Sequence, residues 1–224
     1  MRLIENSLND IAYTYLDSVY EKIQYFEYIN YEKDMIIINA GVEEGFELPY
    51  FDFLTQNTCK IYNIDPSGFN NLSSVSKQVV NSSPNRFHVI NKILWDQESD
   101  SINIPIDSNG TVLCQYYNNN IHQMDTISFS ATTVDEIVEL NKLKKVDLIK
   151  MDIEGGEPYA LKGAMKTISY FRPQLAISIY HLANHYWEIP LYLMKELENY
   201  KFYFGHYSPG RWEAILYAIP IEKL

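Results

Sequence analysis

Short, almost continuously apolar runs alternate with helix-like stretches from residue 35 onwards, and this alternation constrains the fold more than any other feature. A strand that is apolar on both faces has to be covered on both faces, and parallel strands joined by helices meet that need. The pattern therefore predicts an α/β fold with a mostly parallel sheet and helices on both of its faces. We expect strands at 35–39, 59–64, 86–91, 146–151 and 174–180, and helices at 46–56, 67–80, 157–170 and 186–199.

The last part of the chain breaks this alternation. Two apolar runs at 201–207 and 212–219 are separated only by the residues Ser-Pro-Gly-Arg. Proline and glycine favour a tight turn, so we expect the two runs to pair as an antiparallel hairpin at the end of the sheet. Parallel strands followed by such a hairpin resemble the seven-stranded sheet of the Rossmann-like class I methyltransferases, a likeness of fold that implies no function by itself.

Two further segments lie outside this pattern. Apolar residues recur every three or four positions over 4–29, which predicts an amphipathic helix or two short ones. We therefore expect an N-terminal helical extension at 1–32 before a single sheet domain at 33–224. The polar, Ser- and Asn-rich stretch at 97–131 is expected to be an insertion in that domain. It is either a surface loop or a hairpin excursion that contacts substrate.

Charge and cysteine content argue against several classes of protein. The 224 residues include 18 basic and 29 acidic side chains, for a net charge of −11. Sequence-independent binding to nucleic acid needs a basic surface, so we do not expect it. No apolar run reaches the ~18 residues that a membrane span requires. Cys59 and Cys114 are too few for a disulfide framework, so we expect buried thiols in a reducing, cytoplasmic setting.

The loops after the first two expected strands carry residues suited to an adenosine-containing ligand. Gly41 and Gly45 follow the first strand, where glycine lets the backbone approach a ligand closely. Asp65 follows the second, where a carboxylate accepts two hydrogen bonds from a ribose diol. The GxGxxG spacing of a pyrophosphate site is absent, which disfavours NAD and FAD. In the alternative interpretation, Gly41 only forms a turn and Asp65 only caps a helix.

The most specific block is KVDLIKMDIEGGEPYALKGA at 145–164. It resembles the FkbM-type family of S-adenosylmethionine (SAM) dependent methyltransferases, whose signature is a strand ending in K-[IM]-D-x-E-G-x-E and then a helix with L-K-G-A. Residues 91–96 look like the third strand of that family, and 131–137 resemble its V-x-T-T-L-D-E-L segment. Residues 172–181 and the C-terminal hairpin are similar to a bacterial subgroup found with surface-glycan synthesis. The signature is matched by Lys150, Asp152, Glu154, Gly155, Glu157, Leu161, Lys162, Gly163 and Ala164.

The resemblance implies SAM as the cofactor, held by the glycine-containing turn after the first strand. The residues it implies for cofactor binding are Asn39, Gly41, Gly45, Asp65, Pro66, Asp96 and Asp152, with Asp65 on the ribose and Asp96 or its neighbours near the adenine. One position departs from the family pattern, because the first motif usually begins with an acid where this chain has Asn39. Asparagine does not neutralise the ammonium group of SAM. Glu43 and Glu44 either restore that charge or are simply solvated.

Asp152, Glu154 and His181 are the candidate catalytic residues. The two acids end a central strand and His181 ends the next one, so the three are expected at one edge of the sheet. Crowded carboxylates raise the pKa of one of them, which is the condition for a general base near neutral pH. Glu157 begins the following helix, where a structural role is the simpler interpretation.

The sequence also offers candidates for substrate binding and for a metal site. Tyr180, Tyr186 and Trp187 are candidates for an acceptor wall, since aromatic rings stack on sugars, and core packing explains them equally well. Three acids and one histidine also suit Mg²⁺. We nevertheless expect no metal site, because the same acids serve hydrogen bonding and charge balance. Activity that resists EDTA would remove the metal hypothesis.

The leading functional hypothesis is SAM-dependent O-methylation of a sugar hydroxyl in a bacterial surface glycan or glycoconjugate. One alternative is N-methylation of an amino sugar, or of an amino-acid substituent of a glycan. Another is a catalytically silent binding module with the same fold, which the asparagine at position 39 motivates. The oligomeric state is left open.

Overall fold

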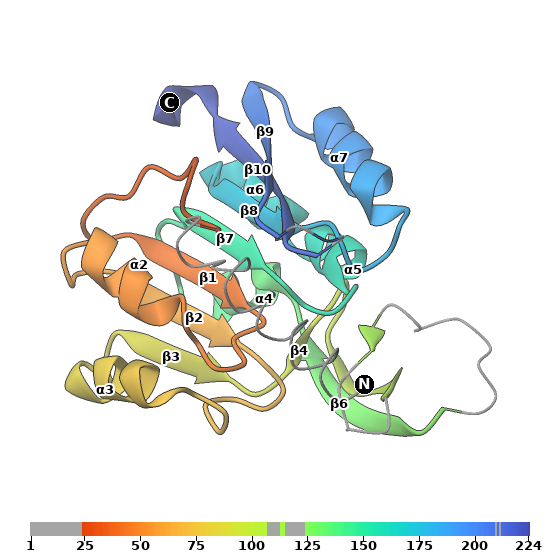
Figure 1. Cartoon of the computed structure of the whole chain (residues 1–224), viewed down its shortest axis with the longest axis horizontal. Helices are drawn as coiled ribbons and strands as arrows, with labels where there is room; N and C mark the ends of the chain where they lie inside the picture. The colour runs from red at the N-terminus through yellow and green to blue at the C-terminus, as the bar shows by residue number, and fades with distance from the viewer. Residues whose placement is uncertain (1–23, 107–112, 115–123, 209, 211) are drawn as a thin grey trace, which may run out of the picture.

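The main sheet has seven strands in the order β3-β2-β1-β7-β8-β10-β9 (Figure 1). The computed structural model describes residues 24–106, 113–114, 124–208, 210 and 212–224. The strands are β1 (Ile36–Ala40), β2 (Lys60–Ile64), β3 (Phe87–Ile90), β7 (Leu148–Met151), β8 (Gln174–Ser178), β9 (Tyr200–His206) and β10 (Ala214–Pro220). The first five of these pair in parallel, and β10 runs antiparallel to both β8 and β9. The predicted α/β sheet with its C-terminal hairpin is confirmed.

The strand order indicates where a ligand would bind in a sheet of this kind. The chain moves outward from β1 to β2 and β3, and then returns to the other side of β1 as β7. In the aligned register, Ala40 at the end of β1 lies beside Ile64 of β2 and Met151 of β7. Ligands of open α/β sheets bind beyond the carboxyl ends of the strands at such a reversal. The loops that follow these three residues therefore meet at one place.

Helices cover both faces of the sheet, as predicted. Residues Ile37 and Ile38 are both fully buried and contribute to different core clusters, because successive side chains of a strand point to opposite faces. Helices α2 (Leu48–Leu54) and α3 (Ser74–Ser82) pack with the cluster that contains Ile37. The other face is covered by α4 (Val134–Leu140), α5 (Glu157–Lys162), α6 (Met165–Phe171) and α7 (His185–Glu196).

Two helix predictions need correction. The helix expected over 67–80 begins only at Ser74, because the hydroxyl of Ser73 caps it by accepting a hydrogen bond from the Ser76 amide. The single helix expected over 157–170 is two helices, separated at Gly163 and Ala164. A Cβ atom at Gly163 would lie 2.2 Å from the carbonyl oxygen of Trp95, so the chain turns there around another segment.

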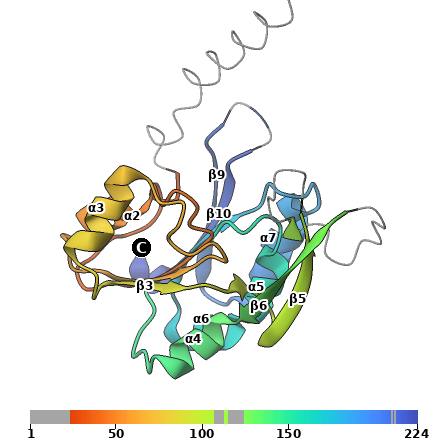
Figure 2. The same cartoon turned by 90° about the horizontal axis from the view of Figure 1, so that it is seen from below.

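A second, three-stranded sheet lies beside α5, apart from the main sheet (Figure 2). It consists of β4 (Ile93–Leu94), β6 (Thr126–Thr132) and β5 (Ser99–Pro105), in that order. The likeness of residues 91–96 to a third strand of the main sheet is therefore wrong, since β3 has that place. In the described part of the 97–131 insertion, β5 and β6 form an antiparallel pair and not a plain loop. Trp95 stacks on Tyr159 of α5, with ring centroids 4.2 Å apart.

The N-terminal helical extension lies mostly outside the described residues. Residues 24–28 form turns, so the helix expected over 4–29 does not continue to residue 29. Tyr25 and Ile29 are buried against the face that carries α2. Near the C-terminus, a short 3-10 helix, η2 (Ile221–Lys223), follows β10. The division into an extension and a main domain stays a prediction.

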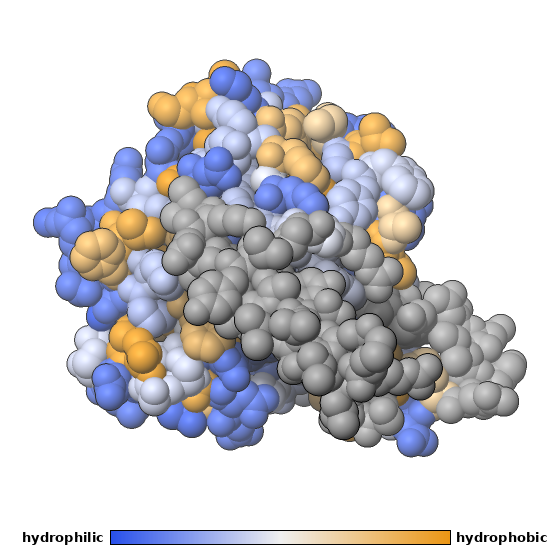
Figure 3. Space-filling model, in the orientation of Figure 1, coloured by the Kyte–Doolittle hydropathy of each residue, from blue (hydrophilic) through white to orange (hydrophobic). Residues whose placement is uncertain are grey.

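The cysteines, the surface and the helix lengths bear on the environment that was expected from the sequence. Cys59 and Cys114 are both buried and free of disulfide bonds, as expected. On the face shown in Figure 3, hydrophobic side chains form small groups among hydrophilic ones. Among the described helices, none is both long and apolar enough to cross a bilayer.

Candidate active site

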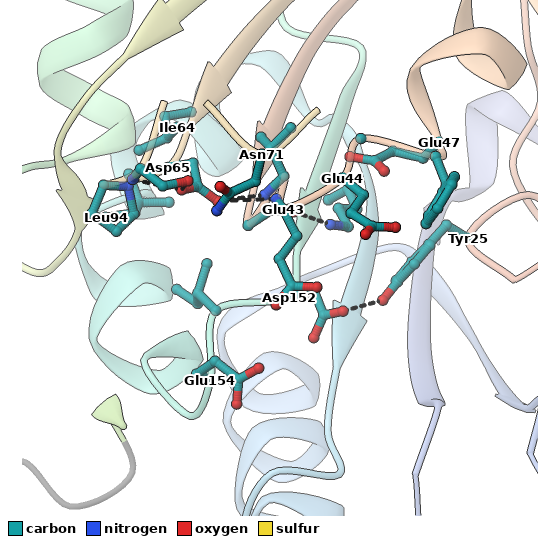
Figure 4. Close-up of a pocket in the computed structure, with 18 of the residues that line it drawn as sticks. Tyr25, Glu43, Glu44, Glu47, Ile64, Asp65, Asn71, Leu94, Asp152 and Glu154 are labelled. Atoms are coloured by element: carbon teal, nitrogen blue, oxygen red, sulfur yellow. Dashed lines mark hydrogen bonds between the residues drawn. The ribbon is translucent and has the colours of Figure 1, made fainter. Parts of the chain in front are cut away.

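A cavity of about 640 Å³ opens where β1, β2 and β7 end (Figure 4). Its walls come from the loops after these strands and from residues 24–26 and 92–94. Seven carboxylates line it, compared with the two ammonium groups of Lys92 and Lys150. The acids are Glu43, Glu44, Glu47, Asp65, Asp152, Glu154 and Glu213. A cavity with this excess of negative charge favours a cationic ligand.

The turn after β1 is shaped by a close approach between two backbone segments. Gly41 has φ +76°, and a Cβ atom there would lie 1.6 Å from the carbonyl oxygen of Asp152. Only glycine fits that position. The buried Lys150 ammonium donates hydrogen bonds to the carbonyls of Ala40 (3.3 Å) and Gly41 (2.6 Å). Gly41 and Gly45 both line the cavity, where the sequence predicts cofactor-binding residues.

Asp65 joins the two loops that form one end of the cavity. Its Oδ2 accepts hydrogen bonds from the amides of Val42 (2.8 Å) and Glu43 (3.2 Å). Its Oδ1 accepts from the amide (2.8 Å) and hydroxyl (2.6 Å) of Ser67. The alternative interpretation as a helix cap is wrong, because residues 66–71 form turns and the next helix, α3, begins only at Ser74. Asp65 and Pro66 both line the cavity.

Asp152 is an ionised carboxylate held by two tyrosines. Tyr25 donates a hydrogen bond to its Oδ2 (2.6 Å) and Tyr180 donates one to its Oδ1 (3.0 Å). Burial alone would raise the pKa of Asp152, but the charges of His181 and Lys150 and the hydroxyl hydrogen bonds lower it below the ordinary value. Asp152 therefore keeps its negative charge at the centre of the cavity.

His181 lies among three carboxylates. Its Nε2 is 3.3 Å from Asp152 and 3.7 Å from Glu154, and its Nδ1 is 3.1 Å from Glu157. Burial lowers its pKa, but the negative charges, that of Glu157 first, outweigh burial and raise the pKa to about 9. His181 is therefore protonated at neutral pH. A protonated imidazole cannot accept a proton, so the predicted role of His181 as a base does not follow from this geometry.

Glu154, unlike Asp152, has a raised pKa. Burial, opposed by the charge of His181 and reinforced by Asp152 and Glu43, raises its pKa to about 7. Its backbone has φ +53° and its side chain is 42% exposed at the cavity wall. A carboxylate whose pKa is close to the working pH is suited to general base chemistry.

Glu157 combines the structural role expected for it with a contact to His181. It is fully buried at the start of α5, and its Oε1 accepts a hydrogen bond from the Ile153 amide (2.9 Å). Its Oε2 lies 3.8 Å from Nδ1 of His185, whose pKa is lowered, mainly by burial. Among the described residues, ligand atoms of Asp152, Glu157 and His181 lie within 4.8 Å of one another, so this group could hold a metal ion. The proton on His181 supplies positive charge at this group, as a bound metal ion would.

Asn39 does not reach the cavity. It is fully buried at the end of β1, and its amide donates hydrogen bonds to Glu47 (2.7 Å) and Asn63 (3.0 Å). Glu43 and Glu44, the acids considered as replacements for the missing charge, are exposed on the rim. Glu47 is instead buried and lines the cavity.

Several predicted residues are not brought to the cavity. Asp96 is exposed and does not line it, whereas Ile93 and Leu94 do. Of the proposed acceptor wall, only Tyr180 lines the cavity, since Tyr186 and Trp187 lie on α7. Residues that the sequence analysis missed as part of the site are Gln24, Tyr25, Glu47, Lys92, Lys150 and Glu213. A charged side chain within an apolar strand was a usable signal for Lys150.

The strand order and the position of the cavity are those of the class I methyltransferase fold. The family model described as the methyltransferase FkbM domain matches residues 26–204. The chain therefore belongs to the FkbM family of methyltransferases.

Comparison with a solved structure at a TM-score of 0.65 agrees with this fold. A methyltransferase FkbM from Methylobacillus flagellatus KT superposes with a TM-score of 0.65 at 21% identity, over 92% of this chain and 49% of the other. The present chain thus spans about half the length of that protein. A SAM-dependent methyltransferase from Aquifex aeolicus has a TM-score of 0.49 and 16% identity, over 95% of both chains. No curated protein matches the chain.

Proposed function

We propose that this chain is a SAM-dependent methyltransferase that O-methylates a sugar hydroxyl of a bacterial surface glycan or glycoconjugate. The observation that carries the proposal is the pair Asp152 and Glu154, two carboxylates of one cavity whose pKa values are shifted in opposite directions. Two carboxyl groups whose pKa values differ in this way can take different roles, one as the charge stabiliser and the other as the proton acceptor. The glycan is inferred from the resemblance of residues 172–181 to the bacterial subgroup. The free thiols of Cys59 and Cys114 agree with the cytoplasmic setting we propose.

The residues that line the cavity fit SAM. The cavity volume of about 640 Å³ lies within the usual range for small-molecule sites. The glycine turn lets a ligand approach the backbone, and Asp65 stands at the tip of β2, where a ribose is expected. When bound, SAM supplies a methyl group on a positively charged sulfur, which the surrounding carboxylates favour.

The chain's own residues then align the acceptor and move one proton. Bound SAM would supply the methyl group to the acceptor oxygen, with S-adenosylhomocysteine (SAH) as the leaving group. In our proposal Glu154 takes the hydroxyl proton, and the ionised Asp152, fixed by Tyr25 and Tyr180, faces the positive charge. His181 keeps its proton and places a positive charge beside both acids.

Of the three aromatic residues predicted as the acceptor wall, Tyr180 is the one placed to contact the methylated sugar, because it lines the cavity and Tyr186 and Trp187 do not. Trp187 is 54% exposed on α7. We therefore assign Tyr186 and Trp187 only to sugar units beyond the one that is methylated.

N-methylation of an amino sugar, or of an amino-acid substituent of a glycan, is the second candidate, and the acid-rich lining is the observation that favours it. Seven carboxylates attract an amine as well as a sulfonium. Glu154 would then take a proton from the ammonium before the nitrogen attacks. NMR of the product distinguishes a methyl group on nitrogen from one on oxygen.

The proposal is tested by incubating the protein with SAM and candidate glycans, followed by mass spectrometry. A gain of one CH₂ unit that requires both SAM and Glu154 supports it. Binding of SAM without methyl transfer to hydroxylated or aminated glycans would instead favour a catalytically silent module.

A further inference from the structure

We propose that Glu47 binds the ammonium group of the methionine part of SAM, and so supplies the charge that the chain lacks at position 39. The inference rests on the proposed function, because it assigns a role within the same cofactor site. It concerns a residue that the sequence motifs do not single out.

Within the described part of the chain, the side chain of Asn39 is hydrogen-bonded to one residue that lines the cavity, Glu47. The amide of Asn39 donates a hydrogen bond to Oε1 of Glu47 at 2.7 Å, and Asn39 itself is fully buried behind that contact. Its second donor bond goes to Asn63 at 3.0 Å, away from the cavity. Asn39 thus fixes the orientation of the Glu47 carboxylate and contributes no charge of its own. The asparagine at this position and the glutamate eight residues later act as one unit.

Glu47 is a buried carboxylate without a cationic partner among the described residues. It is 9% exposed, and no Lys, Arg or His nitrogen of the described chain lies within ion-pair distance of it. Burial raises its pKa, although the more distant charge of Lys150 and the hydrogen bond from Asn39 oppose that rise. A buried charge is costly unless a counter-charge meets it. A cationic ligand group at the cavity wall would meet it.

The position of Glu47 in the cavity matches the amino-acid end of SAM. In Figure 4, Glu47 and Asp65 lie on opposite sides of the cavity, with Glu43 and Asp152 between them. A ligand with its ribose at Asp65 and its sulfur near Asp152 extends its amino-acid chain towards Glu47. The other acids are less suited, because Glu43 and Glu44 are exposed and Glu213 is only partly buried.

The test compares two ligands by isothermal titration calorimetry. SAH carries the ammonium group, whereas 5′-methylthioadenosine keeps the adenosine and the sulfur but lacks the amino-acid carbons. For Glu47→Gln we expect the affinity for SAH to fall about tenfold to a hundredfold, the loss of one charge-assisted hydrogen bond. Affinity for 5′-methylthioadenosine is expected to change less than about twofold. Glu139→Gln removes the same charge from the exposed surface of α4, outside the cavity, and is the control, with less than about a twofold effect on either ligand.

Two results would overturn the inference while leaving the proposed function intact. One is an unchanged affinity of Glu47→Gln for SAH. The other is an equal loss of both ligands, which would mean that Glu47 supports the cavity as a whole and not the ammonium group. If the wild-type protein bound neither ligand, the proposed function itself would fail, and the inference with it.

Discussion

Nδ1 of His181 lies 3.1 Å from Oε1 of Glu157, and this contact keeps a buried histidine protonated beside the cavity. Nε2, on the other side of the ring, faces Asp152 and Glu154. The positive charge therefore lies between a fully buried acid on one side and the two cavity acids on the other. It opposes the rise in the pKa of Glu154 and helps to lower that of Asp152.

Replacing Glu157 with Gln should lower the pKa of His181 from about 9. The amide removes the negative charge that contributes most to raising it, while the shape of the side chain is retained. The measurement is NMR titration of the His181 ring protons in both proteins. The exposed Glu188→Gln, on α7, is the control and should leave the curve in place. A wild-type pKa at or below the ordinary 6.5 would contradict this description of the site.

Glu154→Gln should reduce kcat by about a hundredfold to ten-thousandfold, the usual contribution of a general base. Binding of SAH should change only a few-fold, because Glu154 is assigned to the acceptor and not to the cofactor. In the wild-type protein the rate should rise with pH through about 7 as Glu154 loses its proton. The variant should lack that rise. A variant that keeps wild-type kcat would exclude Glu154 as the base.

His181→Gln should destabilise the protein in a pH-dependent way. The folded-state pKa of about 9 lies above the unfolded value of about 6.5. The stabilisation from the charged histidine is therefore fully present below about pH 6.5 and is lost as the pH rises through 9. The upper bound is on the order of 3 kcal/mol. Urea unfolding of both proteins at each end of this range is the measurement, and a difference in stability that grows with pH would contradict the prediction.

Gly41→Ala should destabilise the protein by more than about 2 kcal/mol, since its Cβ atom would overlap the Asp152 carbonyl and its φ is positive. Gly210→Ala is the matched control, because a Cβ atom there would meet nothing closer than 3.6 Å. Thermal unfolding followed by circular dichroism compares the two. Equal melting temperatures for both variants would show that the close approach at Gly41 is not required.

Treatment with EDTA should leave methyl transfer unchanged within about twofold, because the proton on His181 already places a positive charge among Asp152, Glu154 and Glu157. Loss of activity that Mg²⁺ restores would instead assign Asp152, Glu157 and His181 to a metal ion. Calorimetric titration with Mg²⁺ alone tests the same point without an acceptor, and we expect no binding.

The alternation of apolar runs predicted the main sheet, because a strand such as Ile36–Ala40 needs cover on both faces whatever surrounds it. It could not predict the break at Gly163, which depends on a Trp95 carbonyl far away in the sequence. Nor could it separate β3 from β4, since both are short apolar runs and only their pairing partners differ.

The site was predictable where chemistry follows directly after a strand. Gly41, Asp65, Asp152 and Glu154 all line the cavity for that reason. Tyr25 comes from a segment whose apolar spacing suggested only a helix, and Glu47 resembles an ordinary helix-start acid. Whether a histidine holds or accepts a proton also depends on three-dimensional neighbours. The sequence correctly predicted that His181 lies near Asp152 and Glu154, but the three carboxylates around it determine its charge.

The central claim is that this cavity binds SAM, and calorimetric titration of the wild-type protein with SAM and SAH tests it most directly. The account predicts saturable binding of both, with one molecule for each chain. Absence of binding by either ligand, in protein that is folded by circular dichroism, would contradict it.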